Sequence, residues 1–269
     1  MFRYLLRGKK SKIKVLIGKN NLLKKENEEL KNEIYALKHR KEKIFSIISH
    51  DLMGQIATYN NLVEYLLIKL YSEDVEKKYI ERTLLQLKES SKTTYNLLEN
   101  LLYWAKSHLN QIEFNPNEFE LREAITSQMK ILKLNAENKN ISLNTSIDKK
   151  IYMITDENML KTIIRNLLSN AIKFTENNGK IEVLAEKKDN CVTITIKDSG
   201  VGISEEKINK ILNNFKFSST SGTNGEDGTG LGLILCIDFI KRLGGDLKIS
   251  SIINIGSSFS FTIPITKKT

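Results

Sequence analysis

The sequence lacks an apolar run long enough to cross a bilayer as a helix, and it lacks the pattern of a secretory signal. Cysteine is scarce: Cys191 and Cys236 lie in apolar surroundings, without the spacing of a metal site. We therefore expect both to be core residues in a reducing, cytoplasmic compartment. Proline is equally scarce, and Pro116 and Pro264 fall at expected element boundaries. The sequence thus predicts neither a membrane span nor a disulfide framework.

Acidic residues are rare at the N-terminal end. Residues 1–49 carry 14 Lys and Arg against 5 Asp and Glu, which accounts for nine of the ten net positive charges. A nucleic-acid binder more often spreads basic residues over a folded surface and interleaves aromatics, so we expect no nucleic-acid partner. Residues 1–19 hold seven basic residues and no acidic one. Contact with a membrane surface and a plain solvated tail remain the two interpretations of this stretch, whose first 15 residues form a basic leader.

Leucine and isoleucine recur every seven residues behind this leader. The recurring positions are Leu16, Leu23, Leu30, Leu37 and Ile44, and four residues after them come Asn20, Asn27, Ile34, Lys41 and Ile48. This is a heptad register, with two Asn where parallel two-stranded coils often place a polar residue that fixes register. A single long amphipathic helix is the alternative. Five consecutive heptads favour a parallel coiled coil over residues 16–40, and therefore a homodimer.

Residues 41–113 have the pattern of two helices joined by a short polar turn at 71–75. An antiparallel helical hairpin on a parallel coil dimerises readily into a four-helix bundle. The first helix carries His50 followed by Asp51. A helical histidine is usually a surface or satisfied core residue, but an imidazole beside a carboxylate that orients its ring is also a sensible phosphate-accepting nucleophile.

After Pro116 the pattern becomes mixed. We expect helices over 122–138, 157–174 and 229–243, a short helix within 204–228, and strands over 118–121, 141–147, 151–155, 180–187, 191–197, 246–252 and 257–263. Strands with helices on one side predict an α/β sandwich with one layer of each over residues 117–269. The fold class of the whole chain is therefore α+β.

The expected helix 157–174 carries an unusual polar face. Asn166, Asn170 and Lys173 are spaced four and three residues apart, so they share one side of the helix. Burying two amides and an ammonium is costly unless a partner satisfies them. A nucleoside triphosphate with magnesium would do so, because amide oxygens suit a hard cation and an ammonium suits phosphate. Each motif alone is more often an ordinary polar patch, but two glycine segments follow in order, 198–203 (DSGVGI) and 228–233 (GTGLGL).

In this order the motifs resemble the catalytic half of a bacterial sensor histidine kinase. FSIISHDL resembles the histidine box of the dimerisation and phosphotransfer domain, NLLSNAIKF the N box, and DSGVGI and GTGLGL the two glycine boxes. The resemblance covers roughly residues 38–265. It implies the ATP-binding fold shared with DNA gyrase, the Hsp90 chaperone and the MutL repair protein. It also implies autophosphorylation and transfer to an aspartate of a response regulator receiver domain.

The resemblance assigns a role to each motif. His50 would accept the phosphoryl group and Asp51 would be its general base. Asn170, with Asn166 near it, would ligate Mg²⁺, and Lys173 would contact phosphate. In the ATP pocket, Phe174 would line the adenine site and Asp198 would accept a hydrogen bond from the adenine amino group. The glycine boxes would add Gly200, Gly202, Ile203, Gly228, Thr229, Gly230, Leu231 and Gly232. Lys216, between the boxes, is a candidate phosphate contact from a lid, with an ordinary exposed lysine as the alternative.

The sequence departs from the family after Asp51. The family commonly has a basic residue, then Thr or Asn, then Pro, where this chain has Met53, Gly54 and Gln55. The Thr or Asn positions the water that dephosphorylates the regulator, so we expect weak phosphatase activity. Two alternatives stay open: a non-catalytic ATP-binding dimeric scaffold and an ATPase of the gyrase and Hsp90 kind. The stimulus, transfer within or between subunits, and membership of a longer membrane sensor are also left open.

Overall fold

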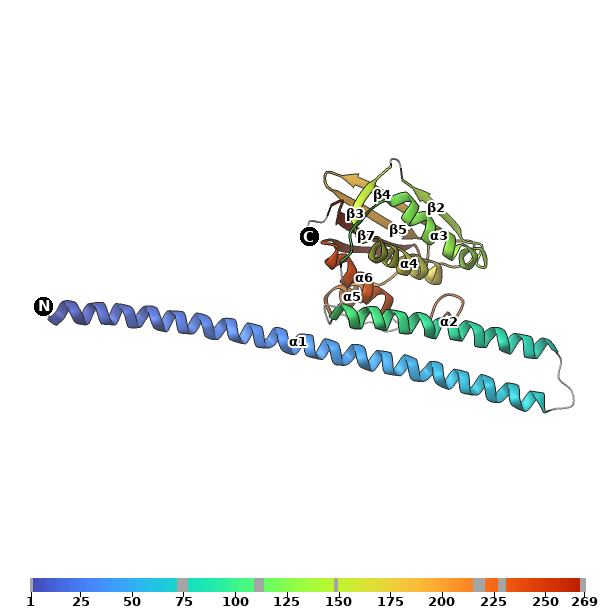
Figure 1. The fold of residues 1–269 in the computed structure, drawn as a ribbon, viewed down its shortest axis with the longest axis horizontal. Coiled ribbons are helices and arrows are strands. Elements are labelled where there is room, and N and C mark those ends of the chain that lie inside the picture. The colour runs from blue at the N-terminus through green and yellow to red at the C-terminus, as the bar shows by residue number, and fades with distance from the viewer. Residues whose placement is uncertain are drawn as a thin grey trace. The chain divides into compact units, whose positions relative to one another are not determined.

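The computed structural model describes residues 2–71, 77–108, 114–147, 150–214, 221–226 and 231–266. Within these ranges the chain forms six helices and seven strands, in the order α1, α2, β1, α3, β2, β3, α4, β4, β5, α5, α6, β6 and β7 (Figure 1). The chain divides into two compact units, Met1–Met53 and Gly54–Thr269. Helix α1 (Phe2–Leu70) passes through the boundary between them without a break.

The first unit is the N-terminal part of α1. Several of its apolar side chains are more than half exposed in the single chain, among them Leu23, Leu30 and Ile34. All three belong to the heptad pattern, so this stretch of helix carries an apolar seam that the described part of the chain leaves exposed. In the described part of the chain, no helix is both long enough and apolar enough to span a bilayer.

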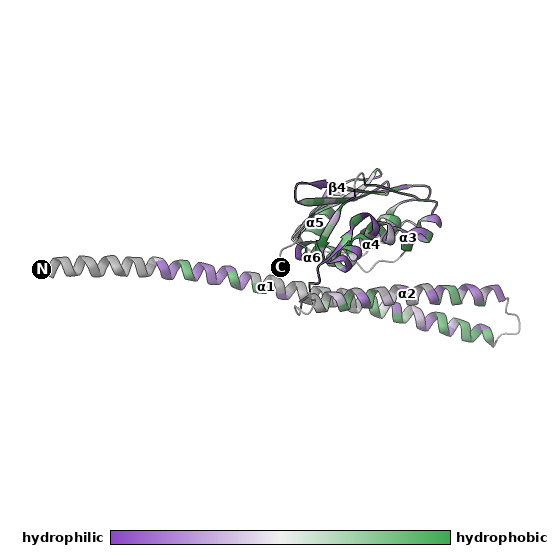
Figure 2. Ribbon diagram, turned by 45° about the horizontal axis from the view of Figure 1, so that its top comes forward, coloured by the Kyte–Doolittle hydropathy of each residue, from purple (hydrophilic) through white to green (hydrophobic). Residues whose placement is uncertain are grey.

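The second unit begins with the end of α1 and continues into α2 (Lys77–His108). Hydrophobic and hydrophilic stretches alternate along α2, as expected for an amphipathic helix (Figure 2). Two polar contacts join the helices: Ser90 Oγ donates to Gln55 Oε1 at 2.9 Å, and Tyr59 Oη donates to Thr94 Oγ1 at 2.9 Å. The partners lie four residues apart on both helices, so the two contacts join one turn of α1 to one turn of α2 and fix the register of the hairpin.

A five-stranded mixed sheet forms one layer of the α/β sandwich. Its strand order is β2-β4-β5-β7-β6, from Ser142–Ser146, Lys180–Lys188, Cys191–Asp198, Gly256–Pro264 and Asp246–Ile252. Only the β2–β4 pair is parallel. Strands β4 and β5 are joined at Asp189, which has a φ of 53°, a conformation that Asp tolerates better than most residues. The sheet is buried on one face, as the alternation of buried and less buried residues along β4 and β5 shows.

Helices α3 (Leu121–Glu137), α4 (Glu157–Phe174) and α6 (Leu231–Arg242) form the second layer. Helix α4 contacts both α3 and α6, and all three helices contact strands of the sheet. The core between the layers is aliphatic, with Phe239 and Phe261 as its fully buried aromatic side chains. The short helix α5 (Glu205–Asn214) follows the first glycine segment. The predicted α+β fold with a two-layer sandwich is confirmed.

One local expectation differs from the structure. The strand expected at 118–121 is β1 (Asn117–Glu120), and it pairs with β3 (Tyr152–Thr155) in a separate two-stranded antiparallel sheet. Leu121 is instead the first residue of α3 and is fully buried in the core. The alternation of side chains in the sequence does not distinguish a last strand residue from a first helix residue when both face the same core.

Candidate nucleotide site

Helix α4 is the element on which the candidate site is built. Asp156 caps its N-terminus, with Oδ1 accepting from the backbone N–H of Met159 at 3.0 Å. Leu160, Ile163, Ile164 and Leu168 are fully buried and attach the helix to the core. This wide apolar stripe fixes the rotation of α4 about its axis, so the orientation of its remaining polar face is fixed as well.

The three polar residues of NLLSNAIKF do share that face. Asn166, Asn170 and Lys173 are all half-buried, between the core stripe and the exposed Ser169. The Asn166 amide nitrogen donates to the carbonyl of Thr162 at 3.0 Å, one turn back, which turns Oδ1 away from the helix backbone. A Cβ at Gly232 would come within 2.9 Å of this oxygen. The described part of the second glycine motif therefore approaches Asn166 closely.

Asp198 ends strand β5 and is 6% exposed. Its Oδ1 accepts two backbone hydrogen bonds, from Gly200 at 2.9 Å and from Ser257 at 3.1 Å. Burial raises the pKa of this carboxyl, and the two hydrogen bonds offset only part of that effect. Both hydrogen bonds end at Oδ1 and hold the carboxyl plane in place, while Oδ2 takes part in neither.

The loop after Asp198 is held from both sides. Val201 donates to the carbonyl of Phe174 at 3.1 Å, and Asn254 donates to the carbonyl of Val201 at 2.8 Å. A Cβ at Gly200 would collide with the Phe174 carbonyl, and Gly202 has a φ of +73°. The first glycine segment is therefore fixed against the end of α4. Ile203, at the end of the segment, packs against the core.

Lys173 and Phe174 end α4 beside this loop. The Lys173 ammonium lies 4.8 Å from the centre of the Phe174 ring, and both side chains are half-buried. The structure thus brings together Asn166, Asn170, Lys173 and Phe174 on one helix, with Asp198 and Gly200 at its C-terminal end and Gly232 against its middle.

Several predicted site residues lie outside this description. Lys216, Gly228, Thr229 and Gly230 fall outside the described residues, as do the side chains of Leu231, His50 and Asp51. The backbone of His50 and Asp51 is helical, within α1.

Gly54 follows His50 by one helical turn and is exposed. A Cβ added there would meet nothing within 4 Å, so a side chain fits at this position without rearrangement. The neighbouring Gln55 accepts the hydrogen bond from Ser90 of α2. Its amide oxygen is therefore engaged in the hairpin.

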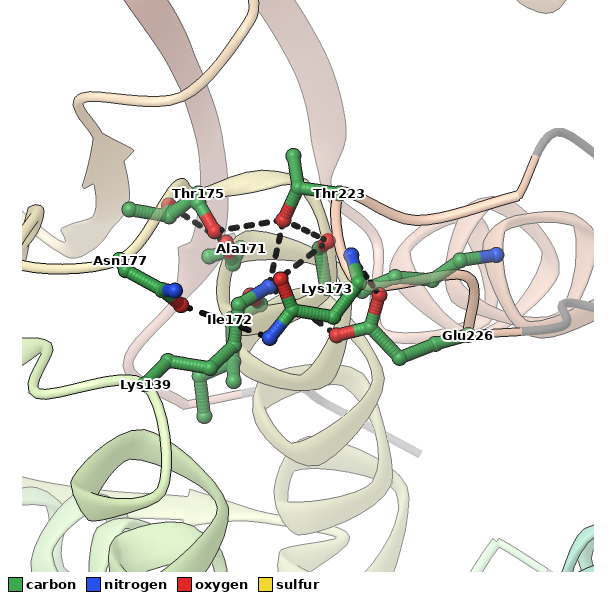
Figure 3. Close-up of polar contacts among 9 residues, drawn as sticks. Lys139, Ala171, Ile172, Lys173, Thr175, Asn177, Thr223 and Glu226 are labelled. Atoms are coloured by element: carbon green, nitrogen blue, oxygen red, sulfur yellow. Dashed lines mark hydrogen bonds and ion pairs between the residues drawn. The ribbon is translucent and has the colours of Figure 1, made fainter.

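The sequence did not single out Lys139, Thr223 and Glu226. Figure 3 shows them gathered at the C-terminal end of α4, where the Lys139 ammonium contacts backbone carbonyls of the helix and both other side chains. The partners of Lys139 lie 33 to 87 residues away in the sequence. One signal was present: Thr223 and Glu226 lie within five residues of the start of the second glycine motif.

The sandwich matches a known family. Residues 155–267 match the model described as "Histidine kinase-, DNA gyrase B-, and HSP90-like ATPase". The match begins at the residue before the cap of α4 and contains Asn166, Asn170, Lys173, Asp198 and both glycine motifs, but not Lys139. The fold and site therefore define an ATP-binding module of this ATPase class.

Individual relatives are histidine kinases. The chain is 29% identical over 249 residues to the adaptive-response sensory kinase SasA of Synechocystis, an alignment that covers 91% of this chain and 63% of that kinase. A solved catalytic domain of the histidine kinase ThkA is 32% identical, with a TM-score of 0.50; the match covers 58% of this chain and 97% of that domain. The chain belongs to the sensor histidine kinase family. It spans less than two thirds of the length of the first curated relatives that it matches.

A third structure adds fold information beyond the sandwich. ThkA in complex with the response regulator protein TrrA matches with a TM-score of 0.61 and 24% identity, over 83% of this chain and 61% of that chain. At this identity the match supports the fold, which includes helical segments before the sandwich.

Proposed function

We propose that this chain is an ATP-dependent protein-histidine kinase that phosphorylates its own His50 and passes the phosphoryl group to an aspartate of a response regulator. The observation that carries the proposal is the Asp198 carboxyl, buried and oriented through one oxygen beside the polar face of α4. A buried carboxyl of this kind is costly unless a ligand donor uses it. The amino group of adenine is such a donor.

The residues present fit ATP and magnesium. Asp198 would accept from the adenine amino group and Phe174 would line the base. The oxygens of Asn166 and Asn170 would reach a magnesium ion, which prefers oxygen ligands and is commonly held together with substrate phosphates. Lys173, and the backbone at the start of α6, would face the phosphates. The ATPase family match over residues 155–267 supports ATP as the nucleotide.

The proposed chemistry moves one phosphoryl group twice, first from an oxygen of ATP to a nitrogen of His50 and then to an oxygen of the regulator. A ring nitrogen of His50 forms a bond to the γ-phosphorus as the bond from phosphorus to the bridging oxygen of ADP breaks. Asp51, as the general base, accepts a hydrogen bond from the N–H of the other ring nitrogen and takes up its proton as the nitrogen–phosphorus bond forms. In the second step the phosphoryl group moves from the nitrogen to a carboxylate oxygen of the regulator, and His50 is restored.

We further propose a division of the chain that matches these steps: a basic leader over 1–15, a signalling coil over 16–40, a dimerisation and phosphotransfer domain over 41–113, and the catalytic domain over 117–269. A receiver domain as partner is supported by the match to ThkA in complex with the response regulator protein TrrA. A parallel homodimer is supported by the exposed heptad residues Leu23, Leu30 and Ile34.

The decisive experiment combines labelling with nucleotide binding. Incubation of the purified chain with γ-labelled ATP and Mg²⁺ should yield protein-bound label that is stable to alkali and lost in acid. His50→Gln should abolish the label and keep the ATP affinity within about twofold, because His50 lies outside the sandwich sequence. Label that persists in His50→Gln would contradict the assignment.

The same experiment separates the alternatives. A non-catalytic scaffold would bind ATP without becoming labelled and without releasing phosphate. An ATPase of the gyrase and Hsp90 kind would release phosphate at equal rates from wild type and His50→Gln.

A further inference from the structure

A buried ammonium group caps the C-terminal end of α4. Lys139, in the turn between α3 and β2, is only 4% exposed. Its Nζ lies 3.0 Å from the Ile172 carbonyl and 3.2 Å from the Lys173 carbonyl. These are among the carbonyls that a helix leaves without an intrahelical partner, and a cation there also meets the negative end of the helix dipole.

The same ammonium holds a segment distant in the sequence. Its Nζ lies 2.6 Å from Thr223 Oγ1 and 3.0 Å from Glu226 Oε1 (Figure 3). Partial burial would raise the pKa of the Glu226 carboxyl, but the hydrogen bond and charge of Lys139, with backbone N–H groups of Glu226 and Asn224, bring it below its usual value. The Glu226 carboxyl is therefore ionised at neutral pH. The Lys139 side chain is 5% exposed and that of Glu226 is 35% exposed, so the ammonium is the better shielded partner.

Residues 221–226 form a closed turn on this support. Gly222 donates to the Glu226 carbonyl at 2.8 Å, and Asn224 donates to Glu226 Oε2 at 2.8 Å. The Thr223 backbone N–H donates to the Lys173 carbonyl at 3.0 Å, and its hydroxyl donates to the Thr175 carbonyl at 2.9 Å. The turn is thus attached to α4 by its backbone as well as by Lys139.

The next carbonyl of α4 accepts a hydrogen bond from the first glycine segment. The Phe174 carbonyl accepts from Val201, in the loop that follows Asp198. Within two consecutive residues, the end of α4 therefore receives the first glycine segment at Phe174 and the turn before the second glycine motif at Lys173. Lys139 contacts this junction on the side of the turn 221–226. Its ammonium donates to four oxygen atoms there, those of Ile172, Lys173, Thr223 and Glu226.

We propose that Lys139 is a positioning residue of the nucleotide site. Its ammonium ties residues 221–226 to the end of α4, and so holds Lys173, Phe174 and the approach to the second glycine motif in one arrangement before ATP binds. Lys139 touches no ligand itself. The inference rests on the proposed function, since it concerns the same nucleotide site.

A buried ion pair is weak evidence for stability, but the removal of one partner leaves the other without compensation. In Lys139→Met the carbonyls of α4 and the Glu226 carboxylate lose their common donor, so the turn should leave its place for part of the time. The apparent affinity then falls in proportion to the fraction of molecules that are still arranged for binding.

The test measures ATP affinity by calorimetry on the full chain with Mg²⁺, together with hydrogen exchange of the backbone amides. Lys139→Met should weaken ATP binding about tenfold, corresponding to about one molecule in ten with the turn in place. Exchange at the Gly222 and Thr223 amides should become faster, while amides of β4 and β5 keep their rates. Lys133→Met, which removes an exposed lysine of α3 paired with Glu137, is the matched control and should bind ATP like wild type.

Two milder variants keep the test decisive if Lys139→Met does not fold. Glu226→Gln removes the negative charge that faces the ammonium, and Thr223→Val removes the hydroxyl group that accepts from it. Both variants leave the contacts of Lys139 with the α4 carbonyls in place. Each should weaken ATP binding and speed exchange at the Thr223 amide. A thermal midpoint that falls in these variants with unchanged ATP affinity would assign Lys139 a purely structural role and overturn the proposal. A wild-type chain that binds no ATP would instead contradict the proposed function, and this inference with it.

Discussion

The Asp198 carboxyl group has opposite effects on the stability of the fold and on the proposed binding of adenine. Burial raises its pKa, so the folded chain holds this proton more tightly than the unfolded chain does. Stability from the neutral carboxyl is complete below the unfolded pKa and is lost as pH rises through the raised pKa. Above the raised pKa the ionised side chain therefore lowers the stability of the fold, while it provides the acceptor that adenine needs.

The variant Asp198→Asn should separate these two effects. Its amide oxygen can still accept from Gly200 and Ser257, and the cost of burying a charge disappears. We expect a thermal midpoint at pH 8 equal to or above that of wild type, with the difference shrinking as pH falls. We also expect weaker ATP binding, because an amide nitrogen would face the adenine amino group with two donors.

Calorimetric titration with ATP and thermal scans at pH 5 and pH 8 provide the measurement. A variant that binds ATP as tightly as wild type would reduce Asp198 to a cap of the strand end. A variant less stable than wild type at pH 8 would show that its hydrogen bonds outweigh the burial cost.

Gly54 concerns the dephosphorylation of the regulator by hydrolysis. Hydrolysis of a regulator's aspartyl phosphate needs a side chain one turn after the histidine to hold water in line, and Gly54 has none. Such positioning commonly contributes a hundredfold or more in rate, about 3 kcal/mol. We expect the chain to load its regulator efficiently and to dephosphorylate it slowly.

Gly54→Thr should raise the dephosphorylation rate, since the space around the added side chain is open. The measurement follows loss of phosphate from purified phosphorylated regulator incubated with the unphosphorylated kinase and ADP. Gly54→Ala, which adds a methyl group without a hydroxyl, is the control. Rapid dephosphorylation by wild type, not raised by Gly54→Thr, would point to Gln55, which must then leave Ser90 to act.

Site residues could be predicted where residues of suitable chemistry also lie at helical spacing in the sequence. Asn166, Asn170 and Lys173 are close in the sequence, so the period of the helix alone places them on one face. Lys139 is one of 42 basic residues, and nothing near it in the sequence marks it as buried. Its role depends on carbonyls of α4 and on a turn 84 to 87 residues away, which only the folded chain brings together.

At the scale of elements, α4 depends on its N-terminal cap. Asp156 is buried, and its two oxygens accept from the backbone N–H groups of Met159 and Asn115. Asp156→Ala should lower the free energy of unfolding by about 2 kcal/mol, the upper range for a cap, because the second donor loses its partner too.

Chemical denaturation measures this loss, with Asp156→Asn as the control that keeps one acceptor oxygen and should lose less. ATP affinity should remain within about twofold, since the cap is at the opposite end of α4 from Lys173. A loss below 0.5 kcal/mol, the low end of measured caps, would show that water replaces both contacts.

Periodicity predicted most elements because the core is one layer of helices on one sheet face. Strands β4 and β5 alternate regularly, and they lie within a residue of the strands expected over 180–187 and 191–197. The pairing of β1 with β3 outside the main sheet was not predicted. Strand order depends on which edges are covered, and four-residue strands contain too little pattern to decide it.

At the scale of the whole molecule, the heptads predict a parallel homodimer. The apolar seam at Leu23, Leu30 and Ile34 is exposed in the single chain, and a second copy would cover it. Sedimentation equilibrium should show a dimer, and replacement of these three residues by Asn or Lys should weaken association at least tenfold. A concentration-independent monomer for wild type would contradict the assembly.

The central claim is that one histidine accepts the phosphoryl group from ATP. The chain has three histidines, His39, His50 and His108, and tryptic cleavage after Lys43 and Lys69 separates His50 from the other two. Mass spectrometry of the autophosphorylated chain, digested at alkaline pH, reads the modified residue directly. We predict phosphate on His50 in the peptide spanning 44–69. Phosphate on His39, on His108 or on a hydroxyl group, or no ATP-dependent phosphate at all, would contradict the account.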